Sequence, residues 1–248
     1  MSRLGTSALQ GSRGCQALIG HTGFVGSNLA IQREFQVCFN SRNIEDIRER
    51  TFREIVCAGA PGVKWKANQE PATDWAAIWR LMDALRQGVS AEHFTLISTV
   101  DVYGVTEGCD ETTYRAPPPL SYGAHRYALE LFVAAHFPSF TIIRLPALFG
   151  PGLKKNALHD LMTARQCGDG TYQWYPVRRL AADIAACRDL MVINFTTPPI
   201  PMTAIRDRFF PKGVVAGGGA YYNLRSIYGH RLTEREVWGE LCTYLAPT

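Results

Sequence analysis

Short apolar runs alternate with more polar, amphipathic segments through the first 150 residues of the chain. Apolar runs of this length with few charges are typical of parallel strands that are covered on both faces. They predict strands at residues 15–20, 35–40, 54–58, 94–98 and 141–145. The segments between them predict helices at residues 24–33, 44–52, 72–88 and 122–135. This alternation predicts an α/β fold with a doubly wound, parallel sheet.

The pattern changes after residue 150, where proline and glycine become frequent. Pro198, Pro199 and Pro201 follow one another closely, and residues 217–219 are three consecutive glycines. Such residues interrupt regular elements, so the strand and helix rhythm ends here. We therefore predict a doubly wound domain over residues 15–150, and a smaller region over residues 151–248 that is interleaved with it.

A glycine-rich turn lies between the first predicted strand and the first predicted helix. Gly20 permits a tight turn, Gly23 lets backbone N–H groups approach a pyrophosphate, and Gly26 lets the helix pack closely on the strand. The helix N-terminus adds partial positive charge. This context predicts a Rossmann dinucleotide-binding site; the alternative is that the glycines serve only the turn. The candidate cofactor contacts in the turn are Gly20, His21, Thr22, Gly23, Phe24, Val25 and Gly26.

The end of the second predicted strand indicates which dinucleotide binds. Proteins of this fold that prefer NAD carry an acidic residue about 20 positions after the first glycine, where it bonds the ribose 2′-hydroxyl. That position here is Asn40, followed by Ser41 and the cation Arg42, which can pair with a 2′-phosphate. The sequence therefore favours NADP over NAD. The alternative is that residues 41–43 form only a solvated turn.

The net charge and the positions of the cysteines indicate which kinds of ligand or partner the protein binds. The net charge is +4 and Lys and Arg are spread along the chain, so nothing indicates nucleic-acid binding, and an anionic small molecule is favoured. The seven cysteines form no CxxC pair and have no His at ligand spacing, which predicts reduced thiols and no metal site. No run approaches the roughly 20 apolar residues of a membrane span, and the N-terminus lacks the apolar core of a signal peptide. We expect a cytoplasmic protein.

Candidate catalytic groups follow the fourth predicted strand. Thr99 and Asp101 stand at its carboxyl end, where open α/β sheets bind their ligands. Tyr122 and Arg126 are four residues apart in the next predicted helix, so both side chains lie on one face. A guanidinium beside a phenol stabilises the phenolate and makes the tyrosine a better acid or base. This pairing indicates proton transfer by Tyr122.

Four segments resemble, in the right order, the motifs of extended short-chain dehydrogenases/reductases, the group that includes nucleotide-sugar epimerases, dehydratases and reductases. The motifs are the glycine turn, a Ser-Thr-x-x-Val-Tyr-Gly strand end, a Tyr-x-x-x-Lys pair and an Arg-Pro-x-x-x-x-Gly-Pro-Gly stretch. They correspond here to residues 20–26, 98–104, 122–126 and 144–152. The resemblance implies an NAD(P)-dependent enzyme with a Rossmann domain and a small substrate-binding region. It also implies a homodimer formed through the helices predicted at 72–88 and 122–135.

The resemblance implies a role for each of three residues. Thr99 falls where the family has a hydroxyl that hydrogen-bonds the reacting oxygen, and Tyr122 where it has the proton-transferring tyrosine. Arg126 replaces the usual lysine. It can hold the nicotinamide ribose and lower the pKa of the tyrosine, but it cannot act as a titrating proton relay. Further cofactor contacts are expected at Ala58, Gly59, Ala60 and Pro146.

The resemblance leaves the role of Asp101 and the substrate contacts open. Asp101 lies where dehydratases of the family carry a glutamate base, but Val100 occupies the place of their neighbouring acid. The alternative is that Asp101 bonds a loop backbone. Trp174 follows Gln173, where an arginine of the family commonly grips a pyrophosphate; replacement cations, or else solvated charges, are Lys154, Lys155, Arg178 and Arg179. The candidate substrate contacts are Trp65, Lys154, Lys155 and Asn156.

These features together lead us to expect an NADP-dependent oxidoreductase or epimerase-type enzyme. It would act on a hydroxyl/keto carbon of a sugar-like substrate that is nucleotide-linked or phosphorylated. Tyr122 would exchange the proton, Thr99 would orient the substrate oxygen, and Arg126 would hold the ribose and tune Tyr122. Two alternatives stay open. One is a sugar-nucleotide dehydratase that uses Asp101, and the other is a catalytically silent NADP-binding regulator.

Overall fold

The computed structural model describes residues 14–113 and 118–246, and in this part of the chain six strands form a parallel sheet. The strands are β1 (Gln16–Ile19), β2 (Val37–Phe39), β3 (Thr51–Cys57), β4 (Ser90–Thr99), β5 (Phe140–Leu145) and β8 (Val192–Asn194). Their order across the sheet is β2-β1-β3-β4-β5-β8. The chain moves outward in one direction from β1 and in the other from β3. The gap between their carboxyl ends is therefore the switch point where such sheets bind ligands.

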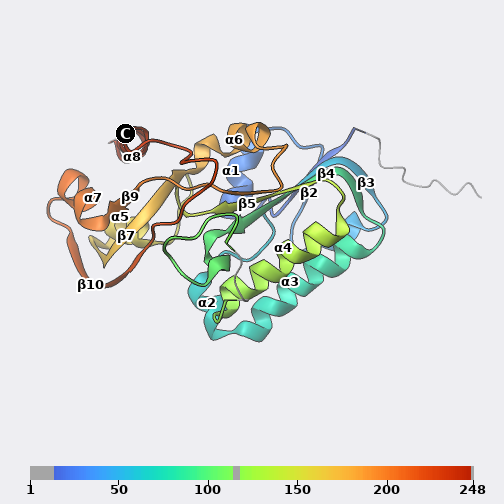
Figure 1. Cartoon of the computed structure of the whole chain (residues 1–248), viewed down its shortest axis with the longest axis horizontal. Helices are drawn as coiled ribbons and strands as arrows, with labels where there is room; N and C mark the ends of the chain where they lie inside the picture. Colours follow the sequence, from blue (N-terminus) through green and yellow to red (C-terminus); the bar gives the residue numbers. More distant parts are fainter. Residues whose placement is uncertain (1–13, 114–117, 247–248) are drawn as a thin grey trace, which may run out of the picture.

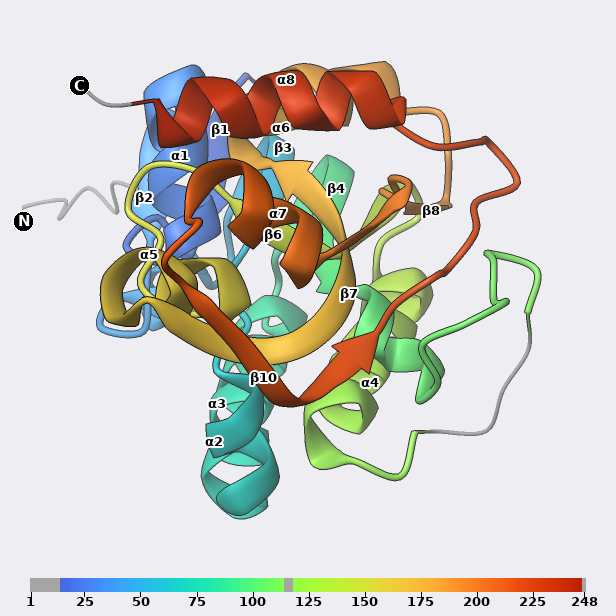
Figure 2. The same cartoon turned by 90° about the vertical axis from the view of Figure 1, so that its left-hand side faces the viewer.

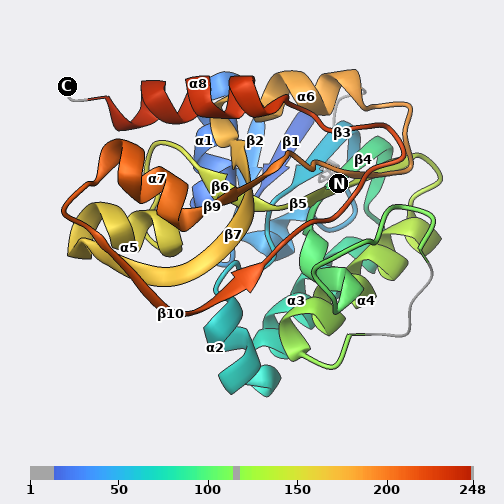
Figure 3. The same ribbon diagram turned by 60° about the vertical axis from the view of Figure 1, so that its left-hand side comes forward.

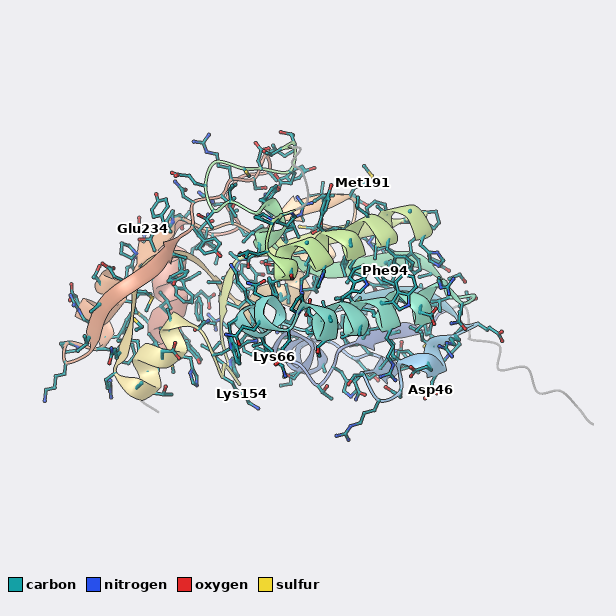
Figure 4. The ribbon with its side chains drawn as sticks, turned by 90° about the horizontal axis from the view of Figure 1, so that it is seen from below. Asp46, Lys66, Phe94, Lys154, Met191 and Glu234 are labelled. Carbon is teal, nitrogen blue, oxygen red and sulfur yellow. The ribbon has the colours of Figure 1, made fainter. Side chains whose placement is uncertain are left out.

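Helices cover both faces of this sheet. Figure 1 shows α1 (Phe24–Gln32) and α6 (Leu180–Ala186) on one face, and α3 (Pro71–Arg86) and α4 (Ser121–His136) on the other. In Figure 4, α3 and α4 run side by side along the sheet. Strand β1 feeds both cores, because Leu18 packs in the core under α1 and α6, whereas Ala17 and Ile19 pack in the core under α3 and α4. The predicted doubly wound α/β fold is confirmed.

A second, smaller sheet follows β5 along the chain. It contains β6 (Ala147–Phe149), β7 (Gln166–Pro176) and β10 (Val214–Tyr221), and β9 (Pro199–Pro201) pairs antiparallel with β7. Figure 2 shows β7 as a long, curved strand with β10 beside it. Three helices pack around this sheet on a hydrophobic core of their own: α5 (Ala157–Ala164), α7 (Met202–Phe209) and α8 (Glu234–Leu245).

The chain passes between the two sheets repeatedly. Figure 3 shows α5, α7 and β7 on one side of the molecule and the six-stranded sheet with α3 and α4 on the other. After β7 the chain returns to the first sheet, where α6 covers a face and β8 pairs with β5. It then reaches the second sheet again through β9.

The segment predicted as a helix at residues 44–52 is mostly not helical. Only the 3-10 turn η1 (Ile44–Ile47) forms there, and β3 already begins at Thr51. Ile44 and Ile47 are buried as a helical pattern requires, but Phe52 is buried because it pairs with Ala91 of β4. Strand pairing therefore overrides the local helical pattern at this point.

The helices in the described residues are too short or too polar to cross a membrane. The expectation about a signal segment concerns residues 1–13, which lie outside the described residues.

Candidate active site

The glycine turn connects β1 to α1 at the carboxyl edge of the sheet. Gly20 has a φ of +86°, and a Cβ there would overlap the carbonyl of Ala58 at the end of β3. A Cβ at Gly26 would overlap the carbonyl of Gly20. Gly23 is different, because it is exposed and the atom nearest to a Cβ there would be 3.4 Å away. The backbone at Gly23, where α1 begins, is therefore open to solvent, as the predicted pyrophosphate contact requires.

We expect alanine at Gly23 and at Gly26 to have different effects. Gly26→Ala should lower the free energy of unfolding by about 1–3 kcal/mol, because the added methyl group forces the helix away from the turn. Gly23→Ala should leave unfolding nearly unchanged and weaken dinucleotide binding, because its methyl group fills the space outside the turn. Thermal unfolding and calorimetric titration separate the two effects. Unchanged affinity in Gly23→Ala would mean that the turn is only structural.

The ends of β1 and β2 lie next to this turn. His21 Nδ1 contacts the Phe39 carbonyl at 3.0 Å, and Asn40 Nδ2 lies 3.5 Å from His21 Nε2. Asn40 Oδ1 accepts a hydrogen bond from Arg42 N at 2.8 Å and holds a tight turn after β2. Arg42 is exposed, so its guanidinium is accessible to a ligand. The remaining predicted cofactor contacts follow β3 and β5 at the same edge of the sheet: Ala58, Gly59, Ala60 and Pro146.

Thr99 and Asp101 are brought together where β4 ends. Thr99 is the last residue of β4, and Asp101 lies in the 3-10 turn η2 (Val100–Tyr103). The Thr99 hydroxyl accepts a hydrogen bond from Asp101 N at 3.2 Å and caps this turn. The Asp101 carboxylate accepts hydrogen bonds from Lys64 Nζ at 2.6 Å and Tyr222 Oη at 2.7 Å. Asp101 is therefore held by side chains from two distant segments.

Tyr122 lies in the first turn of α4, beside this strand end. Its backbone N–H donates to Asn68 Oδ1 at 2.9 Å, so the short helix α2 (Lys64–Gln69) fixes the start of α4. Gly123 allows the close approach of η2, because a Cβ there would overlap the Asp101 carbonyl. The sequence Tyr122-Gly123 thus brings the phenol and the end of β4 into one site.

The Tyr122 hydroxyl lies near charges of both signs. Burial raises the pKa of this phenol. The positive charge of Arg126 opposes the rise, as do the charge of Lys64 and a hydrogen bond with Thr99, whereas the Asp101 carboxylate adds to it. The phenol is therefore protonated at neutral pH, and its release of a proton depends on the surrounding charges.

Arg126 contacts the ring of Tyr122, with its guanidinium carbon 4.0 Å from the ring centroid. Its two terminal nitrogens bind both carboxylate oxygens of Asp74 in α3, at 2.5 and 2.8 Å, and one of them also donates to the Pro61 carbonyl. The side chains of Arg126 and Asp74 are only 3% and 4% exposed. Among the described residues, no group accepts a hydrogen bond from the buried Arg126 Nε. Arg126 is thus part of a buried ion pair behind the tyrosine ring.

The sequence profile of the NAD dependent epimerase/dehydratase family matches residues 38–189, more than half of the chain. The chain belongs to this family. The predicted membership of the extended short-chain dehydrogenases/reductases is thereby confirmed, and with it an NAD(P)-dependent type of enzyme. No curated protein is significantly similar in sequence to the whole chain.

Solved structures of epimerases and reductases share the fold. MoeE5 in complex with UDP-glucose and NAD has a TM-score of 0.72 and 17% identity, over 93% of this chain and 98% of that one. UDP-glucose 4-epimerase from Thermotoga maritima with UDP-glucose has a TM-score of 0.72 and 14% identity, over 92% and 97%. The dTDP-4-dehydrorhamnose reductase from Bacillus anthracis in complex with NADP has a TM-score of 0.64 and 18% identity, over 83% and 84%.

In this epimerase/dehydratase family member, the residues that correspond to the family's substrate loop, and the two arginines after them, have partners within the second sheet and its helices. Gln173 is buried, donates to the carbonyls of Thr197 and Leu224 at 2.7 and 2.9 Å, and accepts from Leu224 N. Trp174 is fully buried in the second core. Its indole therefore offers no surface to a ligand. Arg178 and Arg179 both pair with Glu240 of α8.

The four candidate substrate contacts differ in their surroundings. Asn156 caps α5 by accepting from His159 N at 3.0 Å, and it donates to the Leu148 carbonyl at 2.8 Å. Lys155 donates to the Gly62 carbonyl in the loop that leads to α2. Trp65 is 61% exposed on α2, and Lys154 is exposed as well. Lys155 therefore contacts the loop just before Lys64, and Trp65 follows Lys64 directly in α2. The side chain of Asn156 is already hydrogen-bonded to two backbone groups.

Sequence reasoning assigns no role beside Tyr122 or Arg126 to three residues that the fold brings there: Lys64, Tyr222 and Asp74. Lys64 precedes Asp101 by 37 positions and Tyr222 follows it by 121. The apolar pattern does not predict the six-residue helix that Lys64 begins. The one local signal is that Lys64 follows the turn after β3, at the edge where ligands of such sheets bind.

Proposed function

We propose that the protein is an NADP-dependent oxidoreductase or epimerase-type enzyme acting on a hydroxyl/keto carbon of a nucleotide-linked or phosphorylated sugar. The observation that carries this proposal is the placement of Thr99 at the end of β4 and of Tyr122 in the first turn of α4, at the sheet edge that also holds the glycine turn. The nucleotide sugars named for the solved structures of MoeE5 and UDP-glucose 4-epimerase support the substrate class.

The proposed mechanism assigns the proton to the protein. When bound, the nicotinamide supplies the exchange of a hydride with the substrate carbon. Tyr122 Oη takes or returns the proton of the substrate oxygen, and the Thr99 hydroxyl holds that oxygen in place. Arg126 stabilises the position of the Tyr122 ring from its buried side. The predicted contact of Arg126 with the ribose would require its guanidinium to move away from Asp74. Residues 20–26 hold the pyrophosphate at the start of α1.

A substrate screen tests this proposal. The purified protein is incubated with NADP or NADPH and a panel of nucleotide sugars and sugar phosphates. Net oxidation or reduction appears in the absorbance of the cofactor, and epimerisation appears in proton NMR spectra of the sugar. Tight NADP binding without any turnover across the panel would favour the catalytically silent regulator instead.

The NADP preference predicts a specific effect of Arg42. A charge-assisted pair with the 2′-phosphate contributes about 1.5–3 kcal/mol, so Arg42→Ala should weaken NADP binding roughly 10- to 150-fold. NAD has no 2′-phosphate and serves as the internal control, because its affinity should hardly change. Calorimetric titration of both cofactors measures the difference. Equal affinity of the unmutated protein for NAD and NADP would contradict the proposed preference.

A sugar-nucleotide dehydratase is the second candidate, because the Asp101 carboxylate lies 3.4 Å from the Thr99 hydroxyl in the same site. A base at that position would remove a proton from a carbon next to the reacting one. The other oxygen of the Asp101 carboxylate, Oδ1, is held by Lys64 Nζ at 2.6 Å. The same screen separates the candidates, since dehydration removes one water from the sugar and mass spectrometry detects the loss.

Two further expectations stay predictions. The homodimer would use the outer faces of α3 and α4, where Trp79 and Leu131 are 52% and 54% exposed. Sedimentation of the purified protein would reveal the dimer. The second expectation is a cytoplasmic location, which fractionation of cells that produce the protein would test.

A further inference from the structure

Members of the family, by the resemblance above, carry a lysine four residues after the tyrosine, and this chain has Arg126 there. The charge of Arg126 is compensated, because both of its terminal nitrogens bind the Asp74 carboxylate in a site that excludes water. The pair as a whole is close to neutral. Its effect on the Tyr122 hydroxyl is therefore smaller than that of a free cation at the same distance.

A second cation enters the site from another element. Lys64 begins α2, and its Nζ lies 2.6 Å from Asp101 Oδ1 and 2.8 Å from Tyr222 Oη. The ammonium also lies 5.6 Å from the centroid of the Tyr222 ring. The Lys64 side chain is 43% exposed.

Asp101 brings a negative charge close to Tyr122. Its carboxylate lies 3.4 Å from the Thr99 hydroxyl at the end of β4, and a negative charge at this point opposes formation of a phenolate on Tyr122. Lys64 neutralises that charge directly. If Lys64 were removed, the uncompensated carboxylate of Asp101 would hold the proton on Tyr122.

We propose that Lys64 supplies, in addition to Arg126, positive charge that assists proton transfer by Tyr122, through its ion pair with Asp101 at the end of β4. This inference rests on the proposed function of Tyr122. Lys64 acts through Asp101 and is a positioning residue. Its role depends on charge, so arginine can replace it and a neutral side chain cannot.

Several charged and titratable groups lie near the Tyr122 phenol and can affect its titration. Among the described residues, the charges that act on the phenol are Arg126 of its own helix, Asp101 of η2 and Lys64 of α2. Arg126 is paired with Asp74, which also contacts His125 at 2.7 Å. The phenol of Tyr222 contacts both Lys64 and Asp101, and burial raises the pKa of Tyr222 well above its usual value.

The first test measures the pH dependence of kcat in the direction in which Tyr122 accepts a proton. Lys64→Gln should move the rise in activity to higher pH by about one unit or more, and lower kcat about tenfold at neutral pH. Lys64→Arg should keep the profile of the unmutated enzyme. Asp101→Asn should move the rise to lower pH, and the double variant Lys64→Gln/Asp101→Asn should return it close to the original position. Lys66→Gln, on the exposed side of the same helix, is the matched control and should change nothing (Figure 4).

A second test needs no substrate and therefore separates this inference from the proposed function. The protein is labelled with ¹³C at the tyrosine Cζ atoms, and the Tyr122 signal is assigned by its loss in Tyr122→Phe. Its titration should begin at higher pH in Lys64→Gln and at an unchanged pH in Lys64→Arg and Lys66→Gln. An unchanged titration in Lys64→Gln, or an equal upward shift in Lys64→Arg, would overturn the proposal even if a substrate is found.

Discussion

Replacement of Tyr122 by phenylalanine is expected to lower kcat by about 10²–10⁴-fold, which is the usual contribution of a general acid or base. The change deletes one hydroxyl and keeps the ring, whose contact with the Arg126 guanidinium does not involve the oxygen. The hydrogen bond from the Tyr122 backbone to Asn68 is kept too, so the start of α4 should not move. Cofactor affinity and the midpoint of thermal unfolding should therefore stay nearly unchanged, as steady-state kinetics, calorimetry and thermal scans can verify.

Tyr127 offers a matched control for this variant. It lies in the same helix and is half-buried in a separate apolar cluster that includes Val102 and Leu224. Tyr127→Phe removes the same atom and should leave kcat close to that of the unmutated enzyme. Turnover that survives Tyr122→Phe would contradict the mechanism, and the Asp101 carboxylate would then be the next candidate for the proton-transferring group.

Removal of the Arg126 side chain should have the largest effect on stability. In Arg126→Ala the Asp74 carboxylate keeps its buried position and loses both of its guanidinium contacts. The contact with His125 at 2.7 Å would still be available to the Asp74 carboxylate. Breaking a buried ion pair from one side typically costs about 3–5 kcal/mol. Urea unfolding at neutral pH should show this loss. The double variant Arg126→Met/Asp74→Leu should recover a large part of it, because neither charge is then buried.

The same pair predicts how stability changes with acid. Burial alone would raise the pKa of Asp74, but its hydrogen bonds and charge interactions with Arg126 and His125 outweigh burial and lower the pKa. The contribution of the pair is therefore complete above the pKa of about 3.9 that an unfolded aspartate has, and is lost as the pH falls through the lowered folded value. Arg126→Met/Asp74→Leu should lack this acid-dependent part. Arg80→Ala, which breaks an exposed pair between α3 and Glu45 of η1, should leave the unfolding midpoint at neutral pH almost unchanged.

The sequence alone predicted those parts of the candidate site that are formed by residues close together along the chain. The glycine turn needs three residues at a fixed spacing, and the structure places Gly20 and Gly26 where a side chain would overlap the backbone. Thr99 and Tyr122 follow from a strand end and a helix start, both of which the apolar pattern predicts. The sheet itself is predicted for the same reason, since its strands are short apolar runs that need only be buried.

The sequence pattern could not predict contacts between segments that are far apart along the chain. Arg126 is recognisable as a cation beside Tyr122, but its pairing with Asp74 depends on how α3 packs against α4. The neutralisation of Asp101 by Lys64 depends on a loop after β3 whose path the pattern leaves open. The error at residues 44–52 has the same origin, because Phe52 is drawn into β3 by its pairing with Ala91 of the neighbouring strand.

The return of the chain from the second sheet to β8 restricts how chimeras of this enzyme can be made. A single junction after β5 would exchange α6 and β8 along with the second sheet, and β5 would then pair with a foreign edge strand. Transfer of a relative's second sheet instead requires separate grafts, one over residues 147–176 and another from residue 199 onward. The intervening segment 177–194 must stay with the recipient, because its apolar side chains complete the recipient's own core.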